Sequence, residues 1–112
     1  MLPKENRLSK KNDFDAVFKD GKGVRTAIIS VKSIKNSLSH NRFGFVVSKK
    51  ISTKATVRNK VKRRLRDIVS KVTLLAGVGQ DVVIVAMPGI EKKEFSEVKT
   101  ATESVLVKLN IL

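Results

Sequence analysis

The most unusual feature of this sequence is a cationic stretch near its middle. Residues 57–67 read V-R-N-K-V-K-R-R-L-R-D, and no Asp or Glu occurs between Lys49 and Arg66. Arginine forks and lysine ammonium groups suit phosphate oxygens, and an asparagine amide can donate and accept hydrogen bonds at a sugar or base edge. These residue types therefore predict contact with a nucleic-acid backbone.

On a helical wheel the polar residues of this stretch gather on one side. Apolar residues at positions 57, 61, 65, 68, 69 and 72 form one stripe at about 100° per residue. A solvated helix face is the ordinary explanation for such a pattern. Because no Asp or Glu lies between Lys49 and Arg66, however, ion pairs within the helix cannot be the purpose of these cations. Binding of an external polyanion is therefore favoured. Opposite the stripe lie Asn59, Lys62, Arg63 and Arg66, with Arg58 at its edge.

Two phenylalanines near the N-terminus form a second candidate site. Phe14 and Phe18 are four residues apart, so on a helix they share a face and could form half of a stacking platform for unpaired bases. The alternative is that both belong to the hydrophobic core, and their spacing alone leaves this open. Phe43 and Phe45 alternate as in a strand, and we expect core positions for them.

No constellation typical of a catalytic site is present. The chain has no cysteine, which excludes disulfides and thiol nucleophiles, and its single histidine, His40, does not suffice for a histidine-built metal site. Asp13, Asp15 and Asp20 could hold a divalent ion beside a phosphate, but helix capping and dipole effects explain their placement about as well. We predict no catalytic residue, no metal site and no protein-bound cofactor, and leave the ion at these aspartates as the alternative.

The chain as a whole is also strongly basic. Its 112 residues include 24 Lys and Arg against 10 Asp and Glu, a net charge of +14. The electrostatic field of so strong a positive charge attracts polyanions, of which nucleic acids and anionic membranes are the abundant examples. Hydrophobic residues make up 41% of the chain, enough to fold it. We expect one nucleic-acid-binding domain over residues 1–112, because no repeat or low-complexity linker divides the sequence.

The sequence gives no sign of a membrane protein. Its longest apolar run, 82–87, is too short to span a bilayer, and residues 1–11 lack the apolar region of a secretory signal. The basic helix is expected to turn its apolar stripe toward a core, which argues against membrane-surface binding. We expect a cytoplasmic protein with no membrane partner.

Hydrophobic periodicity predicts the elements that must position these residues. Their order is helix, two or three strands, helix, strand and helix, an α+β sandwich. The predicted elements are a helix capped by Asn12 and ended by Gly21, strands over 26–33 and 42–48, a helix over 57–72, a central buried strand over 82–86, and a last helix starting at Ser96 and Glu97.

Taken together, several motifs resemble the bacterial ribonuclease P protein component, the basic subunit that assists a catalytic RNA in removing the 5′ leader of precursor tRNA. S-K-K-I is followed by A-T-V-R-N-K-V-K-R-R-L-R-D, and the R-N-x-x-K-R helix after S-K-K is the specific part. The N-terminal R-L-S-K-K-N-D-F-D-A-V-F and the later D-V-V-I-V-A-M-P-G extend the resemblance over nearly the whole chain.

The resemblance implies a fold and a function. The fold is a two-layer α+β sandwich of the ribosomal protein S5 domain 2-like type, with a four-stranded sheet, the order α-β-β-β-α-β-α and a left-handed βαβ crossover that carries the basic helix. The function is that of a subunit of an endoribonuclease in tRNA 5′ maturation. The RNA, with bound magnesium, performs the hydrolysis. The implied partners are ribonuclease P RNA and precursor tRNA, with no small-molecule substrate.

The resemblance also assigns two sites to this chain. The third residue of the family's usual R-N-R is here Lys60, which keeps the charge but not the fork, and a tyrosine often found in the cleft is replaced by Ser30. We therefore expect weaker stacking on the leader. The residues expected to bind the RNA subunit are Lys49, Lys50, Arg58, Asn59, Lys60, Lys62, Arg63 and Arg66. Those expected in the leader-binding cleft, between the first helix and the outward face of residues 26–32, are Phe14, Phe18, Ser30 and Lys32.

Two other functions fit parts of the sequence. A generic basic RNA-binding or ribosome-associated protein matches the composition equally well, but it requires no pairing of an aromatic first helix with the S-K-K and R-N-x-x-K-R block. A nuclease that works without RNA would need clustered carboxylates to hold its metals. The 10 acidic residues are scattered, which argues against it.

Overall fold

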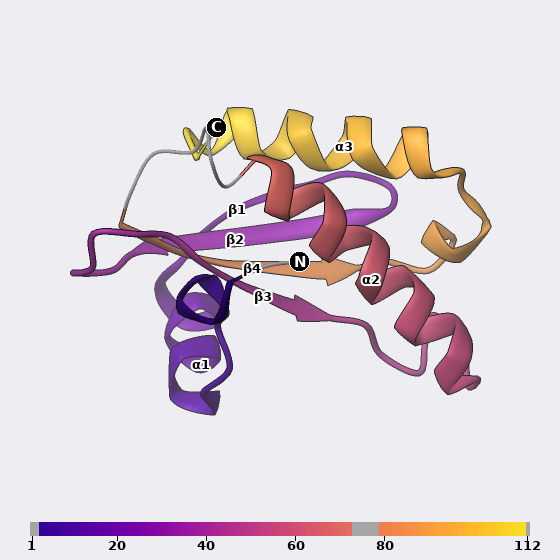
Figure 1. Cartoon of the computed structure of the whole chain (residues 1–112), viewed down its shortest axis with the longest axis horizontal. Coiled ribbons are helices and arrows are strands. Elements are labelled where there is room, and N and C mark those ends of the chain that lie inside the picture. The colour runs from indigo at the N-terminus through magenta and orange to yellow at the C-terminus, as the bar shows by residue number, and fades with distance from the viewer. Residues whose placement is uncertain (1–2, 73–78, 112) are drawn as a thin grey trace.

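The computed structural model describes residues 3–72 and 79–111, which form a four-stranded sheet with helices on both faces (Figure 1). Three strands, a helix, a strand and a helix follow the first helix, which confirms the expected order. In chain order the elements are η1 (Lys4–Asn6), α1 (Lys11–Asp20), β1 (Lys22–Arg25), β2 (Ile29–Lys35), β3 (Arg42–Val46), α2 (Ala55–Val72), β4 (Gln80–Ala86), η2 (Ile90–Lys92) and α3 (Phe95–Lys108).

The strands are ordered β1-β2-β4-β3, with antiparallel pairs β1·β2 and β2·β4 and a parallel pair β3·β4. The apolar strand β4 lies inside the sheet, and both of its faces are covered. Val82 and Ile84 are buried in one hydrophobic cluster, and Val83 between them is buried in another. This confirms the prediction of a central buried strand from the run of apolar residues.

The parallel neighbours β3 and β4 are joined through α2. In Figure 1 both strands run from left to right, α2 crosses in front of the sheet, and the chain rises from β3 to β4. This is a left-handed crossover, the rare hand for such a connection. It carries the cationic helix, as expected.

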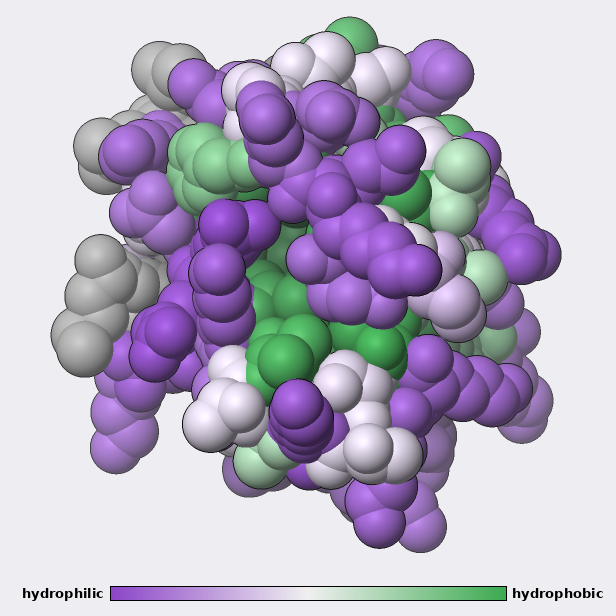
Figure 2. Space-filling model, turned by 90° about the vertical axis from the view of Figure 1, so that its right-hand side faces the viewer, coloured by the Kyte–Doolittle hydropathy of each residue, from purple (hydrophilic) through white to green (hydrophobic). Residues whose placement is uncertain are grey.

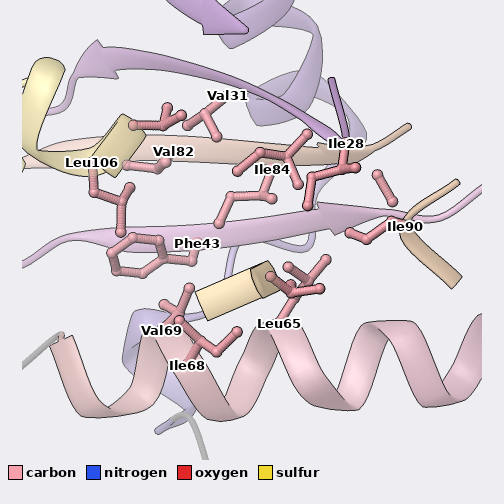
Figure 3. Close-up of a cluster of buried hydrophobic side chains, with 14 of the residues drawn as sticks. Ile28, Val31, Phe43, Leu65, Ile68, Val69, Val82, Ile84, Ile90 and Leu106 are labelled. Atoms are coloured by element: carbon pink, nitrogen blue, oxygen red, sulfur yellow. The ribbon is translucent and has the colours of Figure 1, made fainter. Parts of the chain in front are cut away.

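The main core lies between the sheet and the helices α2 and α3, and these two layers form the expected sandwich. Figure 3 shows Leu65, Ile68 and Val69 of α2 pointing toward Phe43 and Ile84 of the sheet. The expected core position of Phe43 is confirmed, since the side chain is 1% exposed. Phe45 is partly buried against the same cluster.

The helix α1 lies on the opposite face of the sheet. Its fully buried Val17 packs with Leu8 and Val83 in a second, smaller cluster. Because of this arrangement, the sheet face beside α1 is separated from the face that carries α2. The two predicted sites therefore belong to opposite sides of the sheet.

Several predicted boundaries were wrong. Asn12 is not the N-cap of the first helix but its second residue; the cap is Lys10, which makes no side-chain capping bond. The second strand begins at Ile29 rather than Thr26, because the Thr26 hydroxyl accepts hydrogen bonds from the Ile28 and Ile29 amides at 3.3 and 3.1 Å and makes a turn. The last helix begins at Phe95, one residue before the predicted start.

Candidate nucleic-acid interface

The helix α2 presents its polar side to solvent, as its periodicity predicts. Four of the residues expected to bind the RNA subunit are exposed there, and the opposite side packs into the core. Lys62, which we expected to face solvent fully, is half-buried, and so is Arg58 at the edge of the stripe. The exposed four are Asn59, Lys60, Arg63 and Arg66.

The segment before α2 is held in place by its own hydrogen bonds. The Lys50 amide donates to the Ser48 hydroxyl at 3.3 Å, and the Ile51 amide donates to the Ser48 carbonyl at 3.0 Å. The Ile51 side chain is 5% exposed and anchors the turn in the main core. Lys49 and Lys50 are thereby exposed on a defined turn that leads into the helix.

Arg58 connects this segment to α2. Its Nη1 donates to the Ser52 carbonyl at 2.9 Å, a hydrogen bond that spans the start of the helix. A guanidinium carries five N–H donors, so the remaining donors can still face a phosphate. We expected Arg58 only as a phosphate ligand, and the structure adds a structural role.

The cations of this surface form no ion pairs within residues 3–72 and 79–111. Within the described part of the chain, none of the eight residues expected to bind the RNA subunit takes part in an ion pair. Asp67 of α2 pairs instead with Lys71, one turn further along, at 3.6 Å. Figure 2 looks at the end of the molecule where α2 begins and shows mostly hydrophilic surface around a small hydrophobic hollow. Cations that are exposed and form no ion pair among the described residues favour binding of a polyanion at this surface.

On the other face, α1 rests on the sheet through Phe14. A Cβ atom added to Gly44 of β3 would lie 2.4 Å from Cζ of Phe14, so the ring covers a position that only glycine leaves free. Phe14 is half-buried and packs against the smaller hydrophobic cluster. Its ring therefore packs α1 against the sheet.

Phe18, one turn later, has a different environment. Its side chain is 42% exposed, so the alternative that it belongs to the core is excluded. Lys32 of β2 donates through Nζ to the Phe18 carbonyl at 3.3 Å. Ser30 and Lys32 alternate with the core residue Val31, so both lie on the α1 side of the sheet. The four residues expected in the leader cleft therefore lie on the same side of the molecule.

The strand register adds residues that the sequence did not single out. Arg25 of β1 is the partner of Ser30, and Ser30 is in turn the partner of Val85 of β4. Val85 is the partner of Val46. We call these four residues, Arg25, Ser30, Val85 and Val46, the α1-side row. Arg25 is exposed and the other three are partly exposed, so the row is accessible beside α1.

Arg25 was missed because β1 was not recognised as a strand. Its sequence, K-G-V-R, has no run of β-branched residues, and only the pairing with β2 fixes which way Arg25 points. The one signal in the sequence is the positive charge of Arg25 itself, which directly precedes the predicted strand over 26–33.

The aspartates near α1 do not come together. Asp13 lies 3.4 Å from Nη1 of Arg42, whereas Asp15 and Asp20 are exposed. Among residues 3–72 and 79–111, no group of three or more His, Cys, Asp or Glu is placed to hold a metal ion. In the same ranges, no helix has the length and hydrophobicity needed to cross a membrane.

Comparison with known proteins identifies relatives over nearly the whole chain. The Ribonuclease P family model matches residues 2–110. The chain is 37% identical over 95 residues to the ribonuclease P protein component of Syntrophomonas wolfei, covering 85% of this chain and 79% of the relative. It is 38% identical over 106 residues to that of Legionella pneumophila (strain Lens), covering 95% and 90%.

Solved structures agree with these relatives. A mutant of the Staphylococcus aureus RNase P protein with defective mRNA degradation activity superposes with a TM-score of 0.91 at 26% identity, covering 97% of this chain and 92% of that one. The RNase P protein of Thermotoga maritima in complex with 1-(4-fluorophenyl)-2-thiourea superposes with a TM-score of 0.79 at 31% identity, covering 93% and 96%. With its match to the family model, its fold and its cationic α2, this chain belongs to the ribonuclease P protein component family.

Proposed function

We propose that this chain is the protein subunit of a ribonuclease P holoenzyme, in which it binds a catalytic RNA and the 5′ leader of precursor tRNA. The observation that carries the proposal is the exposed cationic face of α2, whose cations form no ion pair with the described residues, in a member of this family. The hydrolysis belongs to the RNA partner with its bound magnesium. The chain itself contributes binding and orientation.

The face of α2 suits docking on a folded RNA. Lys60, Arg63 and Arg66 are exposed, and each can replace condensed counterions at a phosphate. Because these side chains have no acidic partner among the described residues, no intramolecular ion pair must break when RNA binds. The turn with Lys49 and Lys50 extends the same surface.

The α1 side suits a single strand. Phe18 exposes an aromatic face on which an unpaired base can stack, and Lys32 and Arg25 supply cations for the adjoining phosphates. Ser30 occupies the middle of the α1-side row with a small side chain and no ring, so we assign the stacking contact to the exposed Phe18. This assigns the leader to one face of the sheet and the catalytic RNA to the other.

The two contacts together explain how a protein without an active site can assist cleavage. When one chain holds both the catalytic RNA and the leader, the leader becomes bound within a single complex, and less entropy is lost when the scissile bond is positioned. A generic RNA-binding protein would neutralise phosphates without distinguishing precursor tRNA from mature tRNA.

The test is reconstitution of the purified protein with a bacterial ribonuclease P RNA at low magnesium, with cleavage of precursor tRNA as the readout. We expect faster cleavage with the wild-type protein and none from protein freed of RNA. The double variant Arg63→Ala/Arg66→Ala should lose most of the stimulation. Lys99→Ala/Lys108→Ala, which removes two exposed cations from α3, should keep it. A folded wild-type protein without any effect would contradict the proposed function.

A further inference from the structure

A polar network beneath α1 has no part in either proposed RNA contact. Arg42 and Asp81 are register partners at the start of β3 and β4. Arg42 donates to Asp81 twice, from Nε to Oδ1 at 2.8 Å and from Nη2 to Oδ2 at 2.6 Å. Asn36 Nδ2 donates to the same Oδ1 at 2.8 Å. The carboxylate, whose side chain is 8% exposed, therefore holds the guanidinium in one plane.

The third guanidinium nitrogen of Arg42, Nη1, faces α1. This nitrogen lies 3.4 Å from Oδ2 of Asp13 in the first turn of that helix. The next residue, Phe14, covers Gly44, which lies two residues after Arg42 on the same face of β3. An ion pair and an aromatic ring thus fix the beginning of α1 to one short part of β3.

This connection matters because α1 has few other directional contacts. The helix has ten residues and no side-chain N-cap, and helices of this length are marginal without tertiary contacts. The apolar contact of Val17 resists separation but not sliding, because hydrophobic contacts are non-directional. At the other end of α1, Lys32 reaches the Phe18 carbonyl through an exposed hydrogen bond.

We propose that Asp13 is a positioning residue for leader binding. Through Arg42, which Asp81 holds in place, Asp13 sets where α1 lies on the sheet and hence how Phe18 stands relative to Ser30. The proposal rests on the proposed function, because it concerns the face assigned to the leader. Asp13 acts through Arg42 and α1, without direct contact to the RNA.

The chain offers a matched control for the test. Asp13→Asn and Asp15→Asn each remove one negative charge from α1, but only Asp13 has an arginine partner. The readout is leader preference, the affinity of the reconstituted holoenzyme for precursor tRNA divided by its affinity for mature tRNA. We expect Asp13→Asn to reduce this ratio about two- to five-fold, in line with a partly exposed ion pair, and Asp15→Asn to leave it unchanged. Affinity for mature tRNA should not differ between the two variants.

A second variant and a distance measurement follow the position of the helix itself. Arg42→Lys retains the positive charge, but an ammonium group cannot reproduce the planar guanidinium contacts to both Asp81 and Asp13. This variant should therefore reduce leader preference as well. Because the chain has no cysteine, spin labels can be attached at Lys19→Cys on α1 and Lys99→Cys on α3, which are both exposed. The distance distribution between the labels should broaden in Asp13→Asn and not in Asp15→Asn.

The outcomes separate this inference from the function on which it rests. Equal leader preference in Asp13→Asn and Asp15→Asn, with the wild-type preference intact, would overturn the positioning role alone. A wild-type holoenzyme without leader preference would overturn the leader contact and the positioning role together. Restoration of the preference by Asp13→Glu, which returns the charge on a longer side chain, would support the ion pair as the cause.

Discussion

At the scale of single residues, the cations of α2 differ in their roles. Arg63 is exposed and has no protein partner among the described residues, whereas Arg58 is half-buried and bonded to the Ser52 carbonyl. Both were predicted as RNA ligands from the same motif. Sequence periodicity placed Arg58 at the edge of the apolar stripe, but it could not show the hydrogen bond, because that bond depends on the path of the turn before the helix.

This difference predicts distinct effects of two alanine substitutions. Arg63→Ala should weaken docking on the RNA subunit by about 1–3 kcal/mol and change the free energy of unfolding by less than about 0.5 kcal/mol. Arg58→Ala should weaken docking and also cost about 0.5–1.5 kcal/mol of stability, because the hydrogen bond to Ser52 is lost. Equilibrium binding to the RNA and chemical denaturation measure the two quantities. Identical stabilities of both variants would contradict the structural role of Arg58.

At the scale of elements, periodicity was most informative where one face of an element is buried. The stripe of α2 and the apolar run of β4 both predicted their elements, because burial depends on local sequence there. The strand β1 could not be predicted from its residues, since its four residues are mostly exposed and its conformation comes from pairing with β2. The same pairing placed Arg25 in the α1-side row.

The position of α1 illustrates a contact that local sequence does not reveal. Nothing in the spacing of Phe14 and Phe18 indicated that one ring would cover Gly44 and the other would be exposed. This depends on the register of β3 and β4 beneath the helix. The resemblance to the family, rather than the spacing, suggested the cleft.

We expect Gly44→Ala to disturb the packing of α1. The added methyl group would lie 2.4 Å from the Phe14 ring, so the ring or the helix that carries it must shift, at a cost of about 1–3 kcal/mol in stability. The matched control is Gly23→Ala on β1, where the nearest atom to the new Cβ belongs to the flexible Lys32 side chain, at 3.3 Å, and the Val31 carbonyl oxygen is at an ordinary contact distance of 3.6 Å. Thermal melts of both variants check this. Equal melting temperatures would show that Phe14 does not hold α1 against Gly44.

At the scale of the whole molecule, the positive charge is unevenly distributed. Residues 90–108, which include η2 and α3, contain four acidic residues and four lysines, so the net charge of +14 comes from the rest of the chain. The main core therefore joins a nearly neutral helix, α3, to a strongly cationic one, α2. This predicts that RNA lies against α2 and the α1 side while the outer face of α3 stays in solvent.

Salt dependence tests this charge distribution. The logarithm of the association constant for the RNA subunit should fall steeply with the logarithm of salt concentration, because several counterions are released. Arg63→Ala/Arg66→Ala should make the slope shallower by about two, roughly one for each lost phosphate contact. Lys99→Ala/Lys108→Ala on α3 should leave the slope unchanged. Equal effects of the two double variants would mean that charge acts without a defined docking face.

We propose that two faces of one small protein hold two different RNA segments. The most direct measurement compares precursor and mature tRNA binding to holoenzymes reconstituted with wild-type or Phe18→Ala protein. Because Phe18 is 42% exposed, the substitution should leave the melting temperature and docking on the RNA subunit nearly unchanged. It should weaken precursor tRNA binding by about 1–3 kcal/mol, the value of one stacked base, and leave mature tRNA binding as it was. Equal losses for precursor and mature tRNA, or no loss for either, would contradict the assignment of the leader to the α1 side.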